Sequence, residues 1–492
     1  MWTLNLGGRF AAAYLGPMRT FIPLCALALC ACFRNPASGK MQLNLLSESQ
    51  EVELGKQAKQ EAEQAYGIYK DKPELNAYVA DVGKPLSAKS ERPNLPWSYE
   101  IVDDASVNAF ALPGGPIFIT RGILAHLNSE AQMAAVLGHE TGHVAARHSA
   151  NQMSKAQIAQ LGLGVGSILS PAVASAAQVA GEGLQLLFLK YSRDDETQAD
   201  ELGFRYMTKV GYDPTQMIPL FEMLGRVSKQ EGVGKTPEWL QTHPDPGNRL
   251  AETQKRLKTE LKGSTQGMKV ERDKYLQMID GIVFGEDPRQ GFFKGDTFYH
   301  PELKFQWKVP AGWAHQNTTQ AVAAASPNQD AIIQLQSAGK LSPEEAAQKI
   351  FSQQGVQAGQ PVSVRGAKVA RTFVAQAQQG TIEGVMAFVP FQGNTYMLLG
   401  YTKQGGLSTY GNTFIESMGS FGELTDPSAL RVQPAKLKIV RIDQPMTVSE
   451  FNARYPSSVN LDKIALINGV DPGGKIPAGY AKQVLGGTND TK

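Results

Sequence analysis

Two histidines and a glutamate at residues 139–143 have residue types and a spacing that allow joint chemistry. The segment His139-Glu140-Thr141-Gly142-His143 fits the pattern HExxH. On a helix, residues four apart lie within about 40° of each other around the axis, so both imidazoles can meet one metal ion. Glu140 projects beside them, where it can take a proton from a metal-bound water without occupying a coordination position. The spacing therefore predicts a metal site that activates water, with Glu140 as general base.

A third ligand has to come from another histidine or from a carboxylate. A catalytic zinc site usually keeps three protein ligands and one open position that holds water. Cysteine is excluded, because all three cysteines lie within the first 32 residues. Glu196 and Asp200 are again four apart on a predicted helix, so one carboxylate can bind the metal while the other accepts the ring N–H of a ligand histidine. The spacing leaves open which of the two does which.

Two other histidines and an arginine are candidates for roles around the ion. His148 follows His139 by nine residues, about 180° around the same predicted helix, so we expect it to point away from the ion and to pack or cap. His243 lies in a turn-like segment and has three interpretations: it stabilises the oxyanion of the reaction, it occupies the open zinc position and holds the site latent, or it has a surface role at a helix entry. Arg249 is a second candidate for oxyanion stabilisation.

These motifs resemble those of a known peptidase family. The similarity is to the HtpX and CAAX-prenyl-protease family of gluzincin metallopeptidases, in its soluble periplasmic, BepA-like form, over about residues 43–261. The motifs that carry it are His139 to His143, Arg147-His148, Ser192-Arg193 followed by Glu196 and Asp200, and Asn108 to Gly115. The resemblance implies one Zn²⁺ per chain, with Glu196 as the third zinc ligand and Asp200 as the residue that holds a ligand histidine. It also implies a zinc metalloendopeptidase for protein quality control, whose substrates are misfolded or stalled envelope proteins.

The predicted elements around these motifs are mainly helices. Ser129 is a predicted N-cap for a helix that runs to about His148. The strand predicted at 116–120 either presents an exposed edge that pairs with an extended substrate or is an ordinary buried strand. Periodicity predicts another strand at 99–102 and further helices at about 43–67, 72–86, 194–209, 214–230 and 246–261.

The segment from Ile158 to Leu189 is apolar and rich in small residues, but glutamine, glutamate and proline interrupt it. We predict helices that cover the groove of the site and control access to it as a lid. A membrane hairpin is the alternative interpretation, although the segment has no run of about 20 uninterrupted apolar residues.

Beyond Asp287 the pattern changes to strands and turns with few helices. This predicts an α+β, sandwich-like accessory domain over residues 286–422. Its His300 and His315 are predicted to be surface or packing residues and not ligands.

The last predicted unit, residues 436–485, has the order strand, helix, helix, strand. Thr447 and Glu450 form a predicted capping box at the start of its first helix. The unit resembles a LysM module, a small fold associated with glycan binding. The resemblance implies peptidoglycan as a partner, and a purely structural cap is the alternative.

The amino terminus has the pattern of a secretion signal. Arg19 supplies a basic region and Phe21 to Leu29 an apolar core of signal length. Leu29-Cys30-Ala31-Cys32 resembles a bacterial lipobox, so residues 1–31 are predicted to be removed and Cys32 to carry a lipid; ordinary cleavage without lipid is the alternative. Because Phe33 and not aspartate follows Cys32, the resemblance implies a periplasmic protein anchored to the outer membrane.

Composition and length complete the expectation of fold class. Lys and Arg number 48 against 46 Asp and Glu in 492 residues, a formal net charge of +2, so no excess of positive charge favours nucleic acid as a partner. We predict a multidomain α+β chain: a signal peptide at 1–31, a mainly helical zincin-type zinc metallopeptidase domain with a small sheet at 32–270, the accessory domain at 286–422 and the LysM-like βααβ module at 436–485.

Two functions remain open at the level of sequence. The favoured one is a metalloendopeptidase that acts on unfolded or misassembled envelope proteins. The alternative is a lipid-anchored envelope assembly or chaperone factor, or a glycan-binding factor, whose zinc site is latent or structural. The presence of Glu140 favours the enzyme, because a purely structural site does not need a general base.

Overall fold

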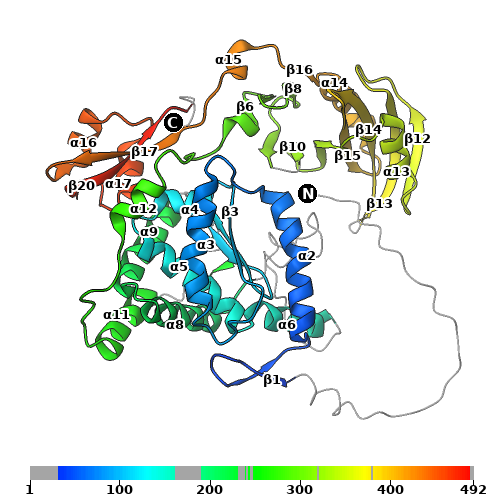
Figure 1. Cartoon of the computed structure of the whole chain (residues 1–492). Helices are drawn as coiled ribbons and strands as arrows, with labels where there is room; N and C mark the ends of the chain where they lie inside the picture. Colours follow the sequence, from blue (N-terminus) through cyan, green and yellow to red (C-terminus); the bar gives the residue numbers. More distant parts are fainter. Residues whose placement is uncertain are drawn as a thin grey trace, which may run out of the picture. The chain divides into compact units, whose positions relative to one another are not determined.

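The computed structural model describes residues 32–160, 190–230, 239, 242–243, 248–318, 321–377 and 380–487. They form two compact units, one from residues 32–286 together with 434–487 and the other from residues 287–433 (Figure 1). The predicted signal peptide at 1–31, and the predicted lid apart from its first three residues, lie outside the described residues. Among the helices that the structure describes, none has both the length and the apolar character needed to cross a membrane.

The first unit is built mainly from helices. The helices predicted at 43–67, 72–86, 194–209, 214–230 and 246–261 are confirmed, with their ends shifted by a few residues. An amino-terminal hairpin pairs β1 (Cys32–Arg34) with β2 (Met41–Leu43). The helices are α2 (Glu48–Tyr66), α3 (Pro73–Ser87), α4 (Arg121–His126), α5 (Glu130–Ala145), α6 (His148–Gln160), α8 (Arg193–Lys209), α9 (Met217–Gln230), α11 (Arg249–Glu260) and α12 (Arg272–Met278), with a 3₁₀ turn η2 (Pro214–Gln216).

A small sheet lies among these helices, with the strand order β3 (Ser98–Val102), β5 (Pro116–Thr120), β4 (Ala109–Ala111). β5 is parallel to β3 and antiparallel to β4, and every residue of β5 is buried. The interpretation of 116–120 as an exposed edge that pairs with substrate is therefore wrong, because strands are hydrogen-bonded on both of its sides. The alternative interpretation, a buried strand, is confirmed.

The helix that carries the HExxH pattern, α5, begins where the sequence predicts but ends earlier. The Ser129 hydroxyl accepts a hydrogen bond from the backbone N–H of Gln132 and caps the helix. The predicted end at His148 is wrong, because α5 ends at Ala145 and Arg147 has a left-handed backbone with φ 60°. The chain turns at Arg147 and begins α6 at His148. Because non-glycine residues rarely adopt this conformation, an arginine at this position does not signal a helix end. The apolar periodicity did not reveal the break either.

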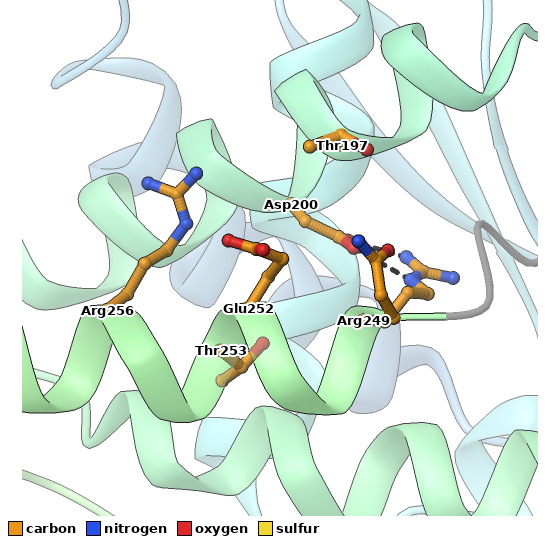
Figure 2. Close-up of a pocket in the computed structure, with 7 residues that line it drawn as sticks. Thr197, Asp200, Arg249, Glu252, Thr253 and Arg256 are labelled. Carbon is orange, nitrogen blue, oxygen red and sulfur yellow. Dashed lines mark hydrogen bonds and ion pairs between the residues drawn. The ribbon is translucent and has the colours of Figure 1, made fainter.

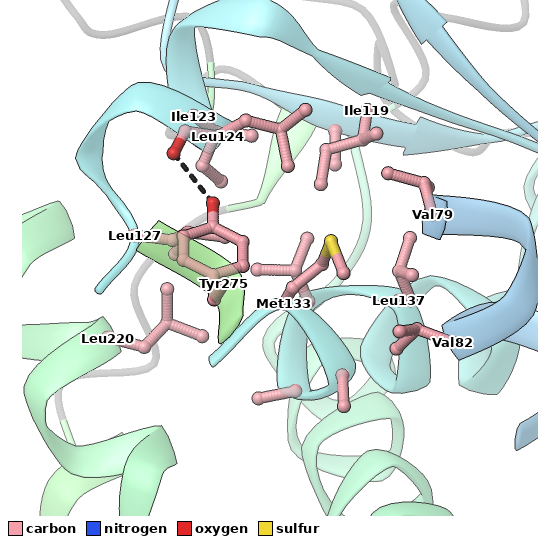
Figure 3. Close-up of a cluster of buried hydrophobic side chains, with 14 of the residues drawn as sticks. Val79, Val82, Ile119, Ile123, Leu124, Leu127, Met133, Leu137, Leu220 and Tyr275 are labelled. Carbon is pink, nitrogen blue, oxygen red and sulfur yellow. Dashed lines mark hydrogen bonds between the residues drawn. The ribbon is translucent and has the colours of Figure 1, made fainter. Parts of the chain in front are cut away.

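Buried apolar side chains from several elements pack against α5 (Figure 3). Val79 and Val82 of α3 lie near Leu137 of α5, and the hydroxyl of Tyr275 in α12 donates to the carbonyl of Leu124 at 2.6 Å. Full burial of one such aliphatic side chain stabilises a fold by about 1.5–3 kcal/mol. The cluster therefore holds α5 as a fixed support for its histidines.

The carboxy-terminal residues of the first unit contain the predicted strand, helix, helix and strand, with one short strand added before the two helices and another after them. Their elements are β17 (Lys436–Ile442), β18 (Met446–Thr447), α16 (Val448–Arg454), α17 (Leu461–Ile467), β19 (Lys475–Ile476) and β20 (Gly479–Leu485), with β17 antiparallel to β20. The capping box of Thr447 and Glu450 is confirmed. Lys482 of β20 is fully buried and donates to the backbone carbonyls of Ala125, at 3.0 Å, and Leu127, where α4 ends. This module is therefore fixed to the metal-bearing part of its unit.

The second unit is α+β, with antiparallel sheets. One sheet has the order β12-β13-β14-β15-β11-β10-β9 and the other β16-β8-β7-β6. His315 of β9 is exposed and stacks on Phe293 with ring centroids 3.7 Å apart, as expected of a packing residue. The elements are η3 (Pro288–Gln290), β6 (Phe292–Lys294), β7 (Thr297–His300), β8 (Phe305–Lys308), β9 (Ala314–Asn317), β10 (Ala321–Ala325), β11 (Ala331–Ser337), α13 (Pro343–Phe351), β12 (Val356–Pro361), β13 (Val369–Ala377), β14 (Gly380–Phe391), β15 (Asn394–Lys403), α14 (Leu407–Met418), β16 (Gly422–Glu423) and α15 (Pro427–Leu430).

Candidate metal centre

Helices α5 and α8 meet at glycines, and this contact brings their polar side chains together. A Cβ added to Gly203 of α8 would lie 2.9 Å from the backbone nitrogen of His139, and one added to Gly138 of α5 would lie 3.2 Å from the Cα of Gly203. A Cβ added to Gly142 would lie 3.0 Å from the carbonyl oxygen of Ala199. The two backbones are therefore in contact, and the carboxylates of α8 lie beside the histidines of α5. Sequence reasoning had assigned no role to these glycines.

Gly203→Ala is expected to lower the free energy of unfolding by about 1–3 kcal/mol, because the added methyl collides with backbone atoms of α5 that cannot rotate away. Equilibrium unfolding in urea measures the change. Gly225→Ala in α9 is the matched control, since nothing lies within 4 Å of a Cβ there. Alanine favours a helix over glycine, so this control should leave stability unchanged or raise it. Equal stabilities of the two variants would contradict a tight contact between α5 and α8.

Four side chains converge on one point in the part of the chain that the structure describes. His139, His143, Glu196 and His243 each offer one ligand atom, and these atoms all lie within 4.8 Å of one another. The Nε2 atoms of His139 and His143 are 3.0 Å apart, and they lie 3.5 and 3.4 Å from the carboxylate oxygens of Glu196. Glu140 adjoins the group, with Oε1 3.6 Å from His243 Nε2. The group is placed to bind one metal ion.

His243 lies inside this group. Its Nδ1 is 3.1 Å from Glu196 Oε1 and 3.4 Å from His139 Nε2. The side chain is only 1% exposed, so the interpretation as a surface residue at a helix entry is wrong.

Three carboxylate oxygens at the group accept no hydrogen bond from the described residues. Glu196 Oε2 and both oxygens of Glu140 are buried and have no hydrogen-bond partner among the described residues. Burying a carboxylate without donors is unfavourable, and a cation bound by Glu196 would remove that penalty. Imidazoles together with one carboxylate are a donor set that zinc prefers. The residues present therefore fit a zinc ion.

Burial and neighbouring charges set the protonation of these side chains. Burial raises the pKa of the Glu140 carboxyl, which suits a group that accepts and returns a proton. Burial would also raise the pKa of Glu196, but the adjacent His243 and His143 outweigh it and hold that pKa well below its ordinary value. Burial lowers the pKa of His143 well below its ordinary value, so this imidazole is neutral, the form that binds metal.

Asp200 lies on the far side of the His139 ring from the group. Its Oδ1 is 2.9 Å from His139 Nδ1, and Arg249 of α11 donates from Nε to its Oδ2 at 2.7 Å. A proton held on His139 Nδ1 leaves Nε2 free for a metal. Figure 2 shows Arg249 directed at Asp200, in a pocket that Thr197, Glu252, Thr253 and Arg256 also line. Arg249 therefore supports Asp200, and this geometry gives no support to a role in oxyanion stabilisation.

His148 is close to the group. The prediction that it points away from the ion, because it lies about 180° from His139 on one helix, is wrong. Because the chain turns at Arg147, the His148 ring folds back, and its Nδ1 lies 2.9 Å from His143 Nδ1. It contacts the ring nitrogen of His143 opposite to the one that faces Glu196. Burial lowers the pKa of His148, so this imidazole too is neutral.

Two aromatic residues that sequence reasoning missed support the group. Tyr191 stacks on His143 with ring centroids 3.9 Å apart, and its hydroxyl is 2.9 Å from that of Ser149. Trp239 stacks on His243 with centroids 4.2 Å apart, and its carbonyl accepts from the His243 backbone N–H at 2.8 Å. The available signals were the positions of Tyr191 next to the Ser192-Arg193 motif and of Trp239 four residues before His243.

Two histidines of an HExxH helix that meet a carboxylate of a later helix define a zincin-type metallopeptidase domain. Residues 73–257 match the family model described as Peptidase family M48. The metallopeptidase resemblance inferred from the motifs is thereby confirmed. The family implies zinc as the metal of the four-residue group.

Curated relatives come from bacteria and from mitochondria. The chain is 31% identical over 193 residues to the beta-barrel assembly-enhancing protease of Yersinia pestis, covering 37% of this chain and 39% of that protein. It is 27% identical over 229 residues to the protein of that name from Escherichia coli (strain K12), covering 45% and 46%. It is 32% identical over 221 residues to the mitochondrial metalloendopeptidase OMA1 of Schizosaccharomyces pombe, covering 44% and 63%. The chain thus spans less than two thirds of the length of each of these relatives.

Proposed function

We propose that this chain is a zinc-dependent metalloendopeptidase that hydrolyses peptide bonds. The observation that carries the proposal is the convergence of His139, His143 and Glu196 beside Glu140, whose two oxygens are buried without a hydrogen-bond partner among the described residues. When bound, zinc lowers the pKa of a coordinated water towards about 7 and offsets the negative charge that develops on the peptide oxygen.

Each residue of the group has a distinct role in this proposal. His139, His143 and Glu196 hold the metal, and Asp200 orients His139 by accepting its Nδ1–H. Glu140 takes the proton of the attacking water and then donates it to the leaving amine. The raised pKa of Glu140 brings proton uptake and release closer to neutral pH.

We propose that His243 holds the site in a latent form. A catalytic zinc site leaves its fourth position to water, and the imidazole of His243 lies among the other ligand atoms, where it would fill that position. Stacking on Trp239 supports this placement of the ring. Hydrolysis then requires His243 to withdraw, and the oxyanion role remains the competing assignment.

Metal removal tests the proposed activity. The purified full chain is expected to contain one zinc per molecule and to cleave an unfolded protein such as reduced casein. Chelation should abolish cleavage and stoichiometric zinc should restore it, because Glu140 has no activated water to deprotonate without the metal. Elemental analysis and gel-based proteolysis measure the two quantities. Bound zinc without cleavage, also after replacement of His243 by alanine, would favour the assembly or chaperone factor with a latent or structural site.

We propose misfolded or stalled envelope proteins as substrates. The support is the beta-barrel assembly in the names of two relatives, together with the signal and lipobox pattern that ends at Cys32. Anchoring to the outer membrane through a lipid on Cys32 and peptidoglycan binding by residues 436–485 belong to the same proposal. We also propose that residues 32–270, 286–422 and 436–485 each act as a functional unit.

A further inference from the structure

A line of polar side chains connects the amino-terminal hairpin to the metal group. Asn35, directly after β1, is 2% exposed and donates from Nδ2 to Gln198 Oε1 at 3.1 Å. Gln198 Oε1 also lies 3.0 Å from His148 Nε2, and His148 Nδ1 lies 2.9 Å from His143 Nδ1. Each link is within hydrogen-bond distance. We call this line the hairpin relay.

The orientation of the Asn35 amide is fixed by its own turn. Its Oδ1 lies 2.8 Å from the backbone nitrogen of Ala37 and 3.0 Å from that of Ser38. A backbone N–H can only donate, so the oxygen of Asn35 must face these two groups and its Nδ2 must face Gln198. Gln198 therefore has to present its carbonyl oxygen, which can only accept, to the relay.

This acceptor determines where every proton of the relay lies. Because Gln198 Oε1 accepts, His148 Nε2 carries a proton, and Asp195 Oδ1, 3.6 Å away, favours the same state. A neutral imidazole has one N–H, so His148 Nδ1 is an acceptor and the proton between the two rings belongs to His143 Nδ1. The remaining lone pair of His143 is then on Nε2, the atom that faces Glu196.

We propose that Asn35 is a positioning residue of the metal centre, which acts through Gln198 and His148 to select the tautomer of His143 that binds the ion. The inference rests on the proposed zinc site. It assigns the hairpin of β1 and β2 a function: the turn that begins three residues after Cys32 helps to set the affinity for metal. Outer partners of ligand histidines commonly change metal affinity by about 10- to 100-fold.

Asn35→Asp reverses the relay by changing one atom of the side chain. A carboxylate keeps the acceptor for the two backbone N–H groups but offers Gln198 an oxygen, so the Gln198 amide must turn and offer its NH₂ to His148. His148 then carries its proton on Nδ1 and His143 on Nε2, which opposes metal binding. The zinc dissociation constant of the full chain, measured by competition with a chelator, should rise by about tenfold. The added negative charge alone would act in the opposite direction.

Three further variants separate the relay from a structural role of the hairpin. Asn44→Asp is the matched control: its side-chain oxygen also accepts from a backbone N–H, that of Leu46, and its zinc affinity should equal wild type. Gln198→Glu keeps an acceptor in either orientation and should bind zinc within about twofold of wild type. Asn35→Ala removes the donor without forcing the amide to turn, so it should weaken binding less than Asn35→Asp.

The outcomes distinguish this inference from the proposed function. Failure of the wild-type chain to bind zinc would overturn both. Zinc binding by wild type with equal affinity in Asn35→Asp would overturn the relay alone. Weaker binding in Asn35→Ala than in Asn35→Asp would also overturn it. If Asn35 mattered only for the fold of the hairpin, the alanine variant would be the weaker one, because only alanine removes the side-chain oxygen that accepts from the backbone N–H groups of Ala37 and Ser38. The order wild type, Asn35→Ala, Asn35→Asp, from tightest to weakest, would support the relay.

Discussion

Replacing Glu140 by glutamine is expected to reduce peptide hydrolysis by about a thousandfold while leaving bound zinc unchanged. General acid–base catalysis contributes about 10²- to 10⁴-fold, and glutamine cannot accept the proton of the attacking water. Zinc should remain because Glu140 lies beside the ligands and is not one of the four side chains that converge. The rate of cleavage of an unfolded protein, measured on samples of verified metal content, gives the effect.

The zinc content separates the general base from a ligand. If Glu140→Gln lost zinc together with activity, Glu140 would be part of the coordination sphere and the roles would have to be reassigned. Near-normal cleavage with full zinc occupancy would rule out Glu140 as the base. Glu53→Gln, at an exposed position of α2, controls for the chemical change itself and should cleave at the wild-type rate.

The metal group could be anticipated from the sequence because its spacing is local. His139 and His143 lie one helical turn apart, as do Glu196 and Asp200, and such pairs share a helix face whatever the rest of the fold does. The distance between the two pairs is not local. It depends on backbone contact of Gly138 and Gly203, and a glycine in a helix looks the same in sequence whether it faces another helix or solvent, as Gly225 illustrates.

The features that could not be predicted from the sequence depend on contacts between residues that are far apart in the chain. The end of α5 depends on the left-handed backbone of Arg147, whose side chain donates to Glu51 at 2.8 Å and to the carbonyl of Leu46 at 2.8 Å. These partners come from a segment about a hundred residues earlier, so no local pattern announces the turn. The contact of His148 with His143 is a consequence of the same turn.

Whether the strand at 116–120 lies at an edge or inside the sheet could not be predicted from the sequence, for a related reason. The strand at 116–120 was recognised, but β4 was not, because Ala109–Ala111 is three residues long and has no alternation of polar and apolar positions. Without β4, one side of β5 looks free. Edge or centre is a property of the neighbours of a strand, and a single short neighbour decides it here.

His243→Ala is expected to increase the rate of cleavage of an unfolded protein by about 10- to 100-fold while zinc stays bound. Three ligands from α5 and α8 remain, and the position that the imidazole fills becomes free for water. The size corresponds to a latent form that outnumbers the open form by about 10- to 100-fold in the wild type, a free-energy difference of about 1.4–2.8 kcal/mol.

The direction of the change decides between the two assignments of His243 that the geometry leaves. A fall in rate with zinc retained would identify His243 as a group that stabilises the oxyanion, and the latent form would have to be abandoned.

His315→Ala makes the same substitution at an exposed strand position of the second unit and should leave the rate at its wild-type value. Because the His243 ring also stacks on Trp239, Trp239→Ala should raise the rate in the same direction, since it loosens the ring without touching a ligand atom. A latch therefore requires both variants to be faster than wild type, whereas an oxyanion group requires both to be slower.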